Sequence, residues 1–432
     1  MGKNTKKQWD LVIIGAGASG MMAAITAARE NKQVCIIEKL DKAGKKLLAT
    51  GNGKCNYTNA VMHADCFHGD KEFIEQVLKR FTVEDCLDFF HSIGIYPKNK
   101  NGYYYPNSEQ AVSVVNALLY ELERLDVKVF YETFVKDIMA SQNEVCVETN
   151  KGKIIGKQVI IATGLLAAPK LGSDGSLFDV IKSMGHRFVS ILPALCGFYC
   201  KGMKFKQVSG VRAHGSVCAY IDGVKQAEDT GEIQFTDYGL SGIPVFQISH
   251  YLSKGLYEKK KVEVKINLLP DFDKTQILDE LNYRCTKGVF MSASTLLNGL
   301  LNQKLSDMIL EKAGVEKEIS LSGLSKDKIL KIAELLQEIT VTVTNYRDFE
   351  FAQVCTGGIP ITDIHPQTLE SKLVPNVYFA GEILDVDGIC GGYNLHFAWA
   401  TGYIAGKAWK GKYDSDYTVE TAISSFGSRF RK

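Results

Sequence analysis

Apolar positions recur along the chain with two different periods, and both appear near its start. Residues 11–14 form a short continuous apolar run and residues 34–37 form another, which is the pattern of strands buried in a parallel sheet. Between them, Met22, Ile25 and Arg29 lie at helical spacing. The start of the chain therefore predicts a strand–helix–strand unit.

This alternation continues to about residue 192. Helical periodicity covers residues 71–93, and Ser108 can cap a further helix whose apolar face runs to Leu122. The expected strands that follow are residues 127–131, 135–138, 145–149, 153–155 and 159–162. The last of them ends in Ala-Thr-Gly, which is where a doubly wound sheet meets a bound cofactor.

The middle of the chain changes character. From about residue 193 to 269 the apolar period is close to two, and turn residues such as Asp222-Gly223 separate the alternating runs. Residues 273–337 have helical periodicity instead. This segment predicts a β-rich inserted domain that carries a helical appendage.

The final third returns to the first pattern. Residues 376–382 predict a strand that runs into a turn, and a helix of small residues follows from about residue 395. We therefore expect an α/β fold with a doubly wound, Rossmann-like domain that is discontinuous in sequence. The expected domain boundaries are 1–192 and 356–432 for that domain, with 193–355 as the insert and about 273–337 as its helical part.

A glycine motif joins the first strand to the first helix. Gly15, Gly17 and Gly20 match G-x-G-x-x-G, in which the first permits the tight turn, the second admits a pyrophosphate and the third packs the helix on the strand. The pyrophosphate sits at the helix N-terminus. Glu38, at the end of the second strand, can accept hydrogen bonds from ribose hydroxyls and disfavours a 2′-phosphate. FAD and NAD both fit this stretch alone.

Length and composition restrict the class of protein. With 432 residues, 45% hydrophobic and 23% charged, the chain can bury two domain cores, and its net charge of +2 does not indicate a nucleic-acid partner. Eleven cysteines without a C-x-x-C pair predict neither a disulfide framework nor a metal site, so we expect a reducing cytoplasm. We also expect no membrane segment and no signal peptide, and the oligomeric state is not indicated.

Residues 43–59 are rich in glycine, lysine and asparagine, which predicts a functional loop rather than a linker. Lys46 and Lys54 offer positive charge, and the backbone of residues 51–53 offers N–H groups to an anion or a ring edge. The glycines before the C-terminal helix likewise prepare its N-terminus for an anion.

Three stretches together resemble one flavoprotein family. They are the loop at residues 43–59, the segment IIATG at residues 160–164, and the segment from Gly357 to Gly406. They are similar to the BaiN/RdsA-like family of FAD-dependent oxidoreductases, which includes ribosomal RNA dihydrouridine synthases, bile-acid ene reductases and aminoacetone oxidases. The resemblance covers essentially the whole chain, and its C-terminal part is highly specific.

The resemblance implies FAD rather than NAD, with Val135 at the adenine and the helix after Asn394 directed at the flavin. The FAD-binding residues that it implies are Gly15, Ala16, Gly17, Ala18, Ser19, Gly20, Glu38, Lys39, Lys46, Gly51, Asn52, Gly53, Cys55, Asn56, Val135, Ala162, Thr163, Gly164, Gly381, Glu382, Asp387, Gly391, Gly392, Tyr393 and Asn394. The family continues ATG with a glycine and Ser-x-Pro, whereas this chain has Leu165-Leu166-Ala167-Ala168-Pro169. The shape of that loop, and with it the substrate entrance, is therefore left open.

The chain has one G-x-G-x-x-G and so no separate nicotinamide domain. NAD(P)H is then a transient electron donor, or the substrate itself supplies the electrons. The preferred hypothesis is an ene reductase, in which hydride reaches one carbon of a carbonyl-conjugated C=C and a protein acid protonates the other. Candidate acids are Cys55, Cys390 and His396, and Lys54 can orient a substrate carbonyl or phosphate. Both a small-molecule enone and uridine in ribosomal RNA fit this chemistry.

Two alternatives stay open at the level of sequence. An FAD-dependent amine oxidase would need an aromatic cage or carboxylate near the flavin, for which Tyr393, Tyr103 to Tyr105 and Glu382 are available. A non-catalytic FAD- or RNA-binding protein would use the insert, where Lys201, Lys204, Lys206, Arg212 and His214 could form a local basic face.

Overall fold

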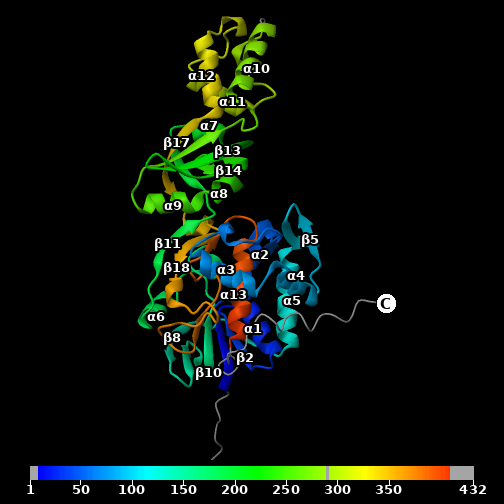
Figure 1. The fold of residues 1–432 in the computed structure, drawn as a ribbon, viewed down its shortest axis with the longest axis vertical. Helices are drawn as coiled ribbons and strands as arrows, with labels where there is room; N and C mark the ends of the chain where they lie inside the picture. Colours follow the sequence, from blue (N-terminus) through cyan, green and yellow to red (C-terminus); the bar gives the residue numbers. More distant parts are fainter. Residues whose placement is uncertain (1–7, 289–290, 409–432) are drawn as a thin grey trace, which may run out of the picture.

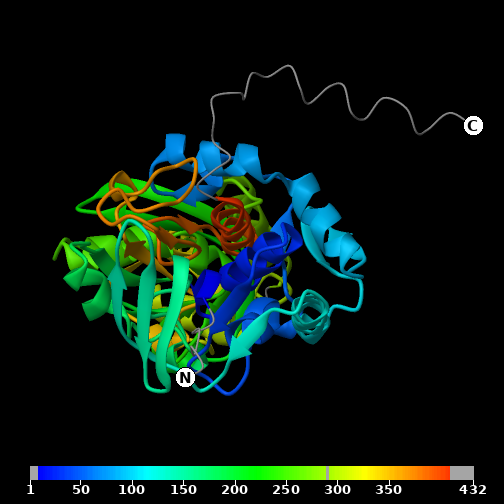
Figure 2. The same cartoon turned by 90° about the horizontal axis from the view of Figure 1, so that it is seen from below.

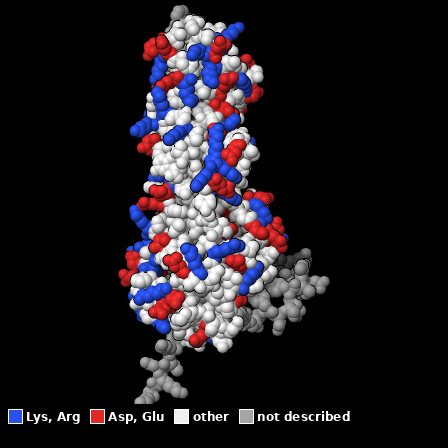
Figure 3. All heavy atoms as spheres, turned by 90° about the vertical axis from the view of Figure 1, so that its left-hand side faces the viewer, with Lys and Arg blue, Asp and Glu red and all other residues white. Residues whose placement is uncertain are grey.

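The structure is a computed structural model, and it describes residues 8–288 and 291–408. The molecule is elongated, with the domain that holds both ends of the described chain at one end and a helical tip at the other (Figure 1). Acidic and basic side chains are interspersed along the face shown in Figure 3, which agrees with the small net charge. Among the described residues, the helices lack the combination of length and apolar character that a membrane span needs.

A seven-stranded sheet forms the centre of the larger domain, with the order β7-β2-β1-β10-β9-β8 and β19 paired to β10. The pairs β7–β2, β2–β1, β1–β10 and β10–β19 are parallel, while β9 and β8 extend the sheet in antiparallel fashion. The strands are β1 (Gln8–Ile14), β2 (Val34–Ile37), β7 (Lys128–Phe130), β8 (Val135–Ala140), β9 (Val145–Thr149), β10 (Gly152–Ile161) and β19 (Val377–Phe379). Residues 153–155 and 159–162, predicted as separate strands, fall in one continuous strand that ends at Ile161.

Two helices from opposite ends of the chain pack against each other beside this sheet. They are α1 (Ala18–Arg29) and α13 (Tyr393–Lys407), which lie side by side in Figures 1 and 2. A Cβ on Gly402 would lie 2.4 Å from the Ser19 carbonyl oxygen, so the backbones approach as closely as glycine allows. This packing brings the N-termini of both helices to one region.

The helix predicted over residues 71–93 is two helices, α3 (Lys71–Arg80) and α4 (Val83–Ser92). Thr82 starts the second one, because its hydroxyl accepts from the Asp85 N–H while the Asp85 carboxylate accepts from the Thr82 N–H. The loop at residues 43–59 also contains a short helix, α2 (Lys45–Ala49). Besides short 3-10 helices, this domain also contains α5 (Ala111–Arg124), α6 (Phe178–Ser183), β3 (Thr58–Asn59), β4 (Phe67–His68), β5 (Pro97–Lys100), β6 (Tyr103–Pro106) and β20 (Asp387–Gly388).

The insert is a closed barrel with the strand order β12-β15-β14-β13-β16-β17. It is joined to the larger domain by the antiparallel pair β11 (Val189–Ala194) and β18 (Val354–Gly358). The barrel strands are β12 (Phe198–Lys201), β13 (Arg212–Ile221), β14 (Val224–Phe235), β15 (Gly239–Ser241), β16 (Val262–Asn267) and β17 (Ile339–Tyr346). The helices of the insert are α7 (Phe205–Val208), α8 (Ile243–Gln247), α9 (Ser249–Tyr257) and, at the tip, α10 (Lys274–Lys287), α11 (Gln303–Lys312) and α12 (Lys326–Gln337). The predicted fold class, an α/β domain with a β-rich insert and a helical appendage, is confirmed.

Candidate active site

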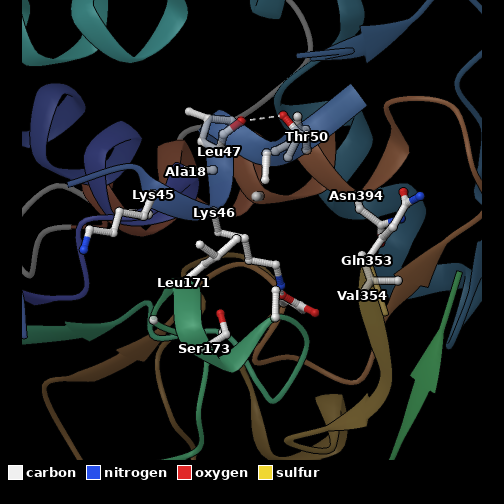
Figure 4. A pocket seen from close by; sticks show the side chains of 18 of the residues that line it. Ala18, Lys45, Lys46, Leu47, Thr50, Leu171, Ser173, Gln353, Val354 and Asn394 are labelled. Carbon is white, nitrogen blue, oxygen red and sulfur yellow. Dashed lines mark hydrogen bonds and ion pairs between the residues drawn. The ribbon is translucent and has the colours of Figure 1, made fainter. Parts of the chain in front are cut away.

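A large cavity of about 1180 Å³ lies where the two helix N-termini, the loop after β1 and the base of the insert meet. Small-molecule sites usually have volumes of roughly 300–1,000 Å³, so this cavity has room for a dinucleotide together with part of a second reactant. Figure 4 shows its centre, where Lys46 points inward while Lys45 points away. Most of the residues expected to bind FAD line it.

The three glycines of the motif differ in the space that surrounds them, and the differences match the contacts expected of each glycine. Gly15 has φ +102°, and a Cβ on Gly20 would lie 2.0 Å from the Gly15 carbonyl oxygen, so both positions are closed to side chains. A Cβ on Gly17, by contrast, would meet no atom within 4 Å, and Gly17 lines the cavity. The backbone at the start of α1 is thus open to a ligand, where unpaired N–H groups favour an anion.

Glu38 fixes a carboxylate at the same end of the cavity. Its Oε2 accepts from the Ala16 N–H and its Oε1 from the Leu40 N–H, both at 2.8 Å, and the residue is only 8% exposed. Because an ionised carboxylate has about four acceptor positions, it can still accept from ribose hydroxyls. Lys39 lies beside it and pairs with Asp174, and Val135 lines the neighbouring wall.

An ion pair lines the cavity. The Lys46 ammonium lies 2.5 Å from Oε2 of Glu382, whose Oε1 accepts from the Cys355 N–H at 2.9 Å. These residues come from α2 and from the loop after β19, which are far apart in sequence. Ala162, Thr163 and Gly164 line the wall next to them.

The N-terminus of α13 also lines the cavity. Gly391 and Gly392 precede it with φ +140° and +92°, and a Cβ on Gly392 would lie 2.7 Å from Oδ1 of Asn56. The Asn394 side chain accepts from the Gly388 N–H at 2.8 Å and donates to the Gly388 carbonyl at 2.7 Å, which holds the preceding loop in place. This helix end is the second site for an anionic or electron-rich group.

These features fit FAD. The open Gly17 backbone suits the pyrophosphate, the fixed carboxylate of Glu38 suits the adenosine ribose, and the N-terminus of α13 would favour the electron-rich edge of the ring system. The expected FAD-binding residues that line the cavity are Gly15, Ala16, Gly17, Ala18, Ser19, Glu38, Lys39, Lys46, Gly51, Asn52, Asn56, Val135, Ala162, Thr163, Gly164, Glu382, Gly391, Gly392 and Asn394.

Six expected FAD-binding residues do not line the cavity: Gly20, Gly53, Cys55, Gly381, Asp387 and Tyr393. A Cβ on Gly381 would lie 2.5 Å from Oγ of Ser19, so this glycine serves the packing of the loop on α1. Asp387 is buried, and its carboxylate faces the Nδ1 atom of His250 in α9 at 3.2 Å. The Asp387 carboxylate thus contacts the insert and not the cavity.

Two of the four candidate catalytic residues, Cys390 and Lys54, line the cavity. Burial raises the pKa of the Cys390 thiol to about 11, so the thiol is protonated at neutral pH. The Gln247 side chain of α8 holds the Cys390 backbone, accepting from its N–H at 2.6 Å and donating to its carbonyl at 3.3 Å. The insert thereby fixes the position of this loop.

The other two candidates, Cys55 and His396, do not line the cavity. Their expected role as proton donors is therefore wrong for this structure. Cys55 is fully buried outside the cavity wall, and burial raises its pKa to about 12. His396 is fully buried as well, with Nε2 donating to the Phe81 carbonyl at 3.1 Å and Nδ1 accepting from the Thr58 hydroxyl at 2.9 Å. Because both ring nitrogens have partners in the core, His396 joins the two segments that it contacts.

Sequence reasoning missed the part of the cavity that the insert and its connections supply. These lining residues are Leu195, Ile243, Phe246, Phe351, Gln353 and Val354. No local motif marks them, because they reach the cavity only through the packing of the barrel on the larger domain. Tyr103 and Tyr105, considered above only for an amine cage, also line the cavity, and burial raises the pKa of each.

The chain is similar to one family model and to several known proteins. The family model described as the HI0933-like protein Rossmann domain matches residues 9–408. The 3-dehydro-bile acid delta(4,6)-reductase of Clostridium scindens is 41% identical over 92% of this chain and 98% of its own length. The ribosomal RNA dihydrouridine synthase of Escherichia coli is 28% identical over 92% and 97%. A 3-ketosteroid-delta4-(5alpha)-dehydrogenase structure from Rhodococcus jostii has 14% identity and a TM-score of 0.47, covering 94% of this chain and 97% of that one.

Proposed function

The chain belongs to the HI0933-like family of FAD-dependent oxidoreductases, and from that premise we propose that it uses NAD(P)H to reduce a small enone. The substrate that we propose is a steroid of the bile-acid class with a C=C bond conjugated to a carbonyl. The observation that carries this choice is the 41% identity to a bile-acid reductase along nearly the whole chain, against 28–29% to ribosomal RNA dihydrouridine synthases.

Apolar side chains in the cavity wall support an apolar reactant. Leu195, Ile243, Phe246 and Phe351 line the cavity, and Ile243 and Phe351 are 56% and 54% exposed. Exposed apolar side chains at the entrance of a cavity gain most from covering an apolar ligand, at about 25 cal/mol per Å² buried. A fused steroid ring system offers such a surface, whereas an RNA chain carries a charged phosphate at every nucleotide.

Bound FAD supplies hydride transfer between the nicotinamide and the conjugated C=C. The chain's own residues must hold the cofactor, exclude water and provide one proton for the carbon next to the carbonyl. We assign the proton to Sγ of Cys390, because the thiol lines the cavity and stays protonated at neutral pH. Gln247 keeps that thiol in place through the backbone of the loop.

An anaerobic titration of the purified yellow protein tests the proposal. NADH or NADPH should bleach the flavin absorbance, and a bile-acid enone should restore it with a product two hydrogens heavier. A uridine-containing fragment of 23S ribosomal RNA, offered in parallel, should not restore it. Restoration by the RNA and not by the enone would overturn the choice of substrate. Absence of bleaching by both nicotinamides would overturn the choice of donor.

The role of Cys390 has its own test. Cys390→Ala should slow the return of the flavin absorbance by the enone by about 100-fold or more, which is the usual contribution of a positioned acid. Bleaching by the nicotinamide should keep its rate, because that step needs no proton from the thiol. Cys285→Ala, at a partly exposed cysteine in α10, is the matched control. Equal loss of both steps in Cys390→Ala would show a disturbed site instead.

A further inference from the structure

Three lysines converge on one carboxylate beside the cavity. The ammonium groups of Lys98, Lys100 and Lys54 lie 2.5, 2.6 and 3.5 Å from the carboxylate oxygens of Glu109. Lys98 and Lys100 belong to β5, Lys54 follows α2, and Glu109 follows β6. The lysine side chains are 39%, 43% and 50% exposed, so solvent and solutes reach all three.

This cluster has a surplus of positive charge. Hydrogen bonds from Lys100 and Lys98 lower the pKa of Glu109 to about 2, so its carboxylate is ionised at neutral pH and cancels one of three charges. In residues 8–288 and 291–408, no other carboxylate lies within 4 Å of these lysine nitrogens. Two positive charges thus remain within a few ångströms of each other, which favours a bound oxyanion.

The cluster adjoins the end of the cavity where Cys390 lies. Lys54 itself lines the cavity, together with Tyr103 and Tyr105 of β6. The Lys100 ammonium is 5.9 Å from the centre of the Tyr105 ring, and a Cβ on Gly391 would lie 3.1 Å from Tyr103. The β5–β6 hairpin thus connects the charged cluster directly to the wall of the reaction site.

We propose that Lys54, Lys98 and Lys100 form an oxyanion subsite that holds the anionic group of a reactant while its reactive end occupies the cavity. The inference rests on the proposed function and extends it, because it requires that reactant to carry a carboxylate or a phosphate. The carboxylate would be the side-chain acid of the steroid enone. The phosphate would belong to the nicotinamide donor. Lysine suits either one, since its compact charge needs no fixed geometry.

Two kinds of substitution test the subsite: one removes positive charges of the lysines, and the other removes the negative charge of Glu109. In the FAD-loaded protein, the K98Q/K100Q double variant should raise the KM of the anionic reactant about 2- to 30-fold, from the usual strength of two exposed ion pairs. E109Q should lower that KM, because it frees the lysines from their internal partner. A neutral steroid enone should keep its KM in both variants. K79Q/K260Q is the control, since these exposed lysines pair with Glu75 and Glu258 away from the cavity.

The same experiment distinguishes the two sources of the anion, the steroid carboxylate and the phosphate of the nicotinamide donor. A KM change for the steroid carboxylate alone assigns the subsite to the substrate, and a change for NADPH or NADH alone assigns it to the donor. An unchanged KM for all anionic reactants in K98Q/K100Q would overturn the proposal, as would an equal rise for the neutral enone.

Binding can also be followed without any reaction. A saturated steroid carboxylate should perturb the oxidised flavin spectrum with a Kd that rises in K98Q/K100Q, falls in E109Q and increases with salt. If neither nicotinamide reduces the protein, the proposed function fails while this titration still tests a subsite for the steroid carboxylate. Titration with NADP⁺ tests the donor phosphate in the same way. Identical Kd values for both ligands across all variants would overturn the subsite alone.

Discussion

Replacing His396 by asparagine should flatten the dependence of stability on pH below about 6.5. His396 is fully buried, and burial lowers its pKa from the ordinary 6.5 to about 4. As the pH falls below 6.5, the unfolded chain binds a proton at this ring that the folded protein does not bind until about pH 4. Stability contributed by the neutral ring is therefore complete above pH 6.5 and is lost as the pH falls.

The size of the effect follows from the shift. Each pH unit between the two pKa values costs about 1.4 kcal/mol, so the folded state loses about 3 kcal/mol from this ring alone. His68, whose pKa burial also lowers to about 4, adds a loss in the same direction. Because His68 is present in both proteins, the difference between wild type and H396N isolates His396.

Urea unfolding of the FAD-loaded protein, in excess FAD and between about pH 7 and pH 4.5, measures this. H396N should be less stable at pH 7, since the Thr58 hydroxyl and the Phe81 carbonyl lose their partner, but its free energy of unfolding should fall less steeply with pH. H91N, at an exposed histidine, should keep the wild-type slope. Parallel curves for H396N and wild type would refute the assignment of His396 as a buried neutral ring.

Three further substitutions have definite expectations. Gly17→Ala places its Cβ in open space, so the fold should persist while the FAD retained after desalting falls about tenfold or more, measured by absorbance. Gly20→Ala would put a Cβ 2.0 Å from the Gly15 carbonyl and should instead lower the melting temperature by several degrees or prevent folding. Gln247→Leu removes both hydrogen bonds to the Cys390 backbone and should lower the free energy of unfolding by about 1–3 kcal/mol, measured in urea.

The parts that the sequence predicted well depend on local rules. The unit from β1 to β2 is specified by glycines in distinct steric environments and by an acid at the strand end. The tight turn at Gly15 and the close packing at Gly20 could therefore be predicted before any coordinates. The alternation of period two likewise predicted the barrel strands. These rules involve neighbours within one supersecondary unit, and tertiary packing leaves them intact.

The predictions that failed concern residues whose positions depend on contacts between segments far apart in the sequence. Cys55 and Cys390 both follow glycine-rich or polar loops, and only the packing of the chain buries one and places the other in the cavity. His396 lies on a helix that is buried almost all round, so no polar face distinguished it. Ile243 and Phe246 reach the site only because the barrel docks on the larger domain.

The pairing of β10 with β19 has a consequence for the order in which the protein is made. Val159 pairs with Val377, so the central sheet stays incomplete until the barrel and its helical tip have left the ribosome. Strands β11 and β18 bracket the barrel, which lets it close as a unit during synthesis. The face of α1 that packs against Gly402 of α13 stays uncovered until then. A nascent chain that stalls before Val377 would thus expose the apolar flank of this helix and become a target for chaperones.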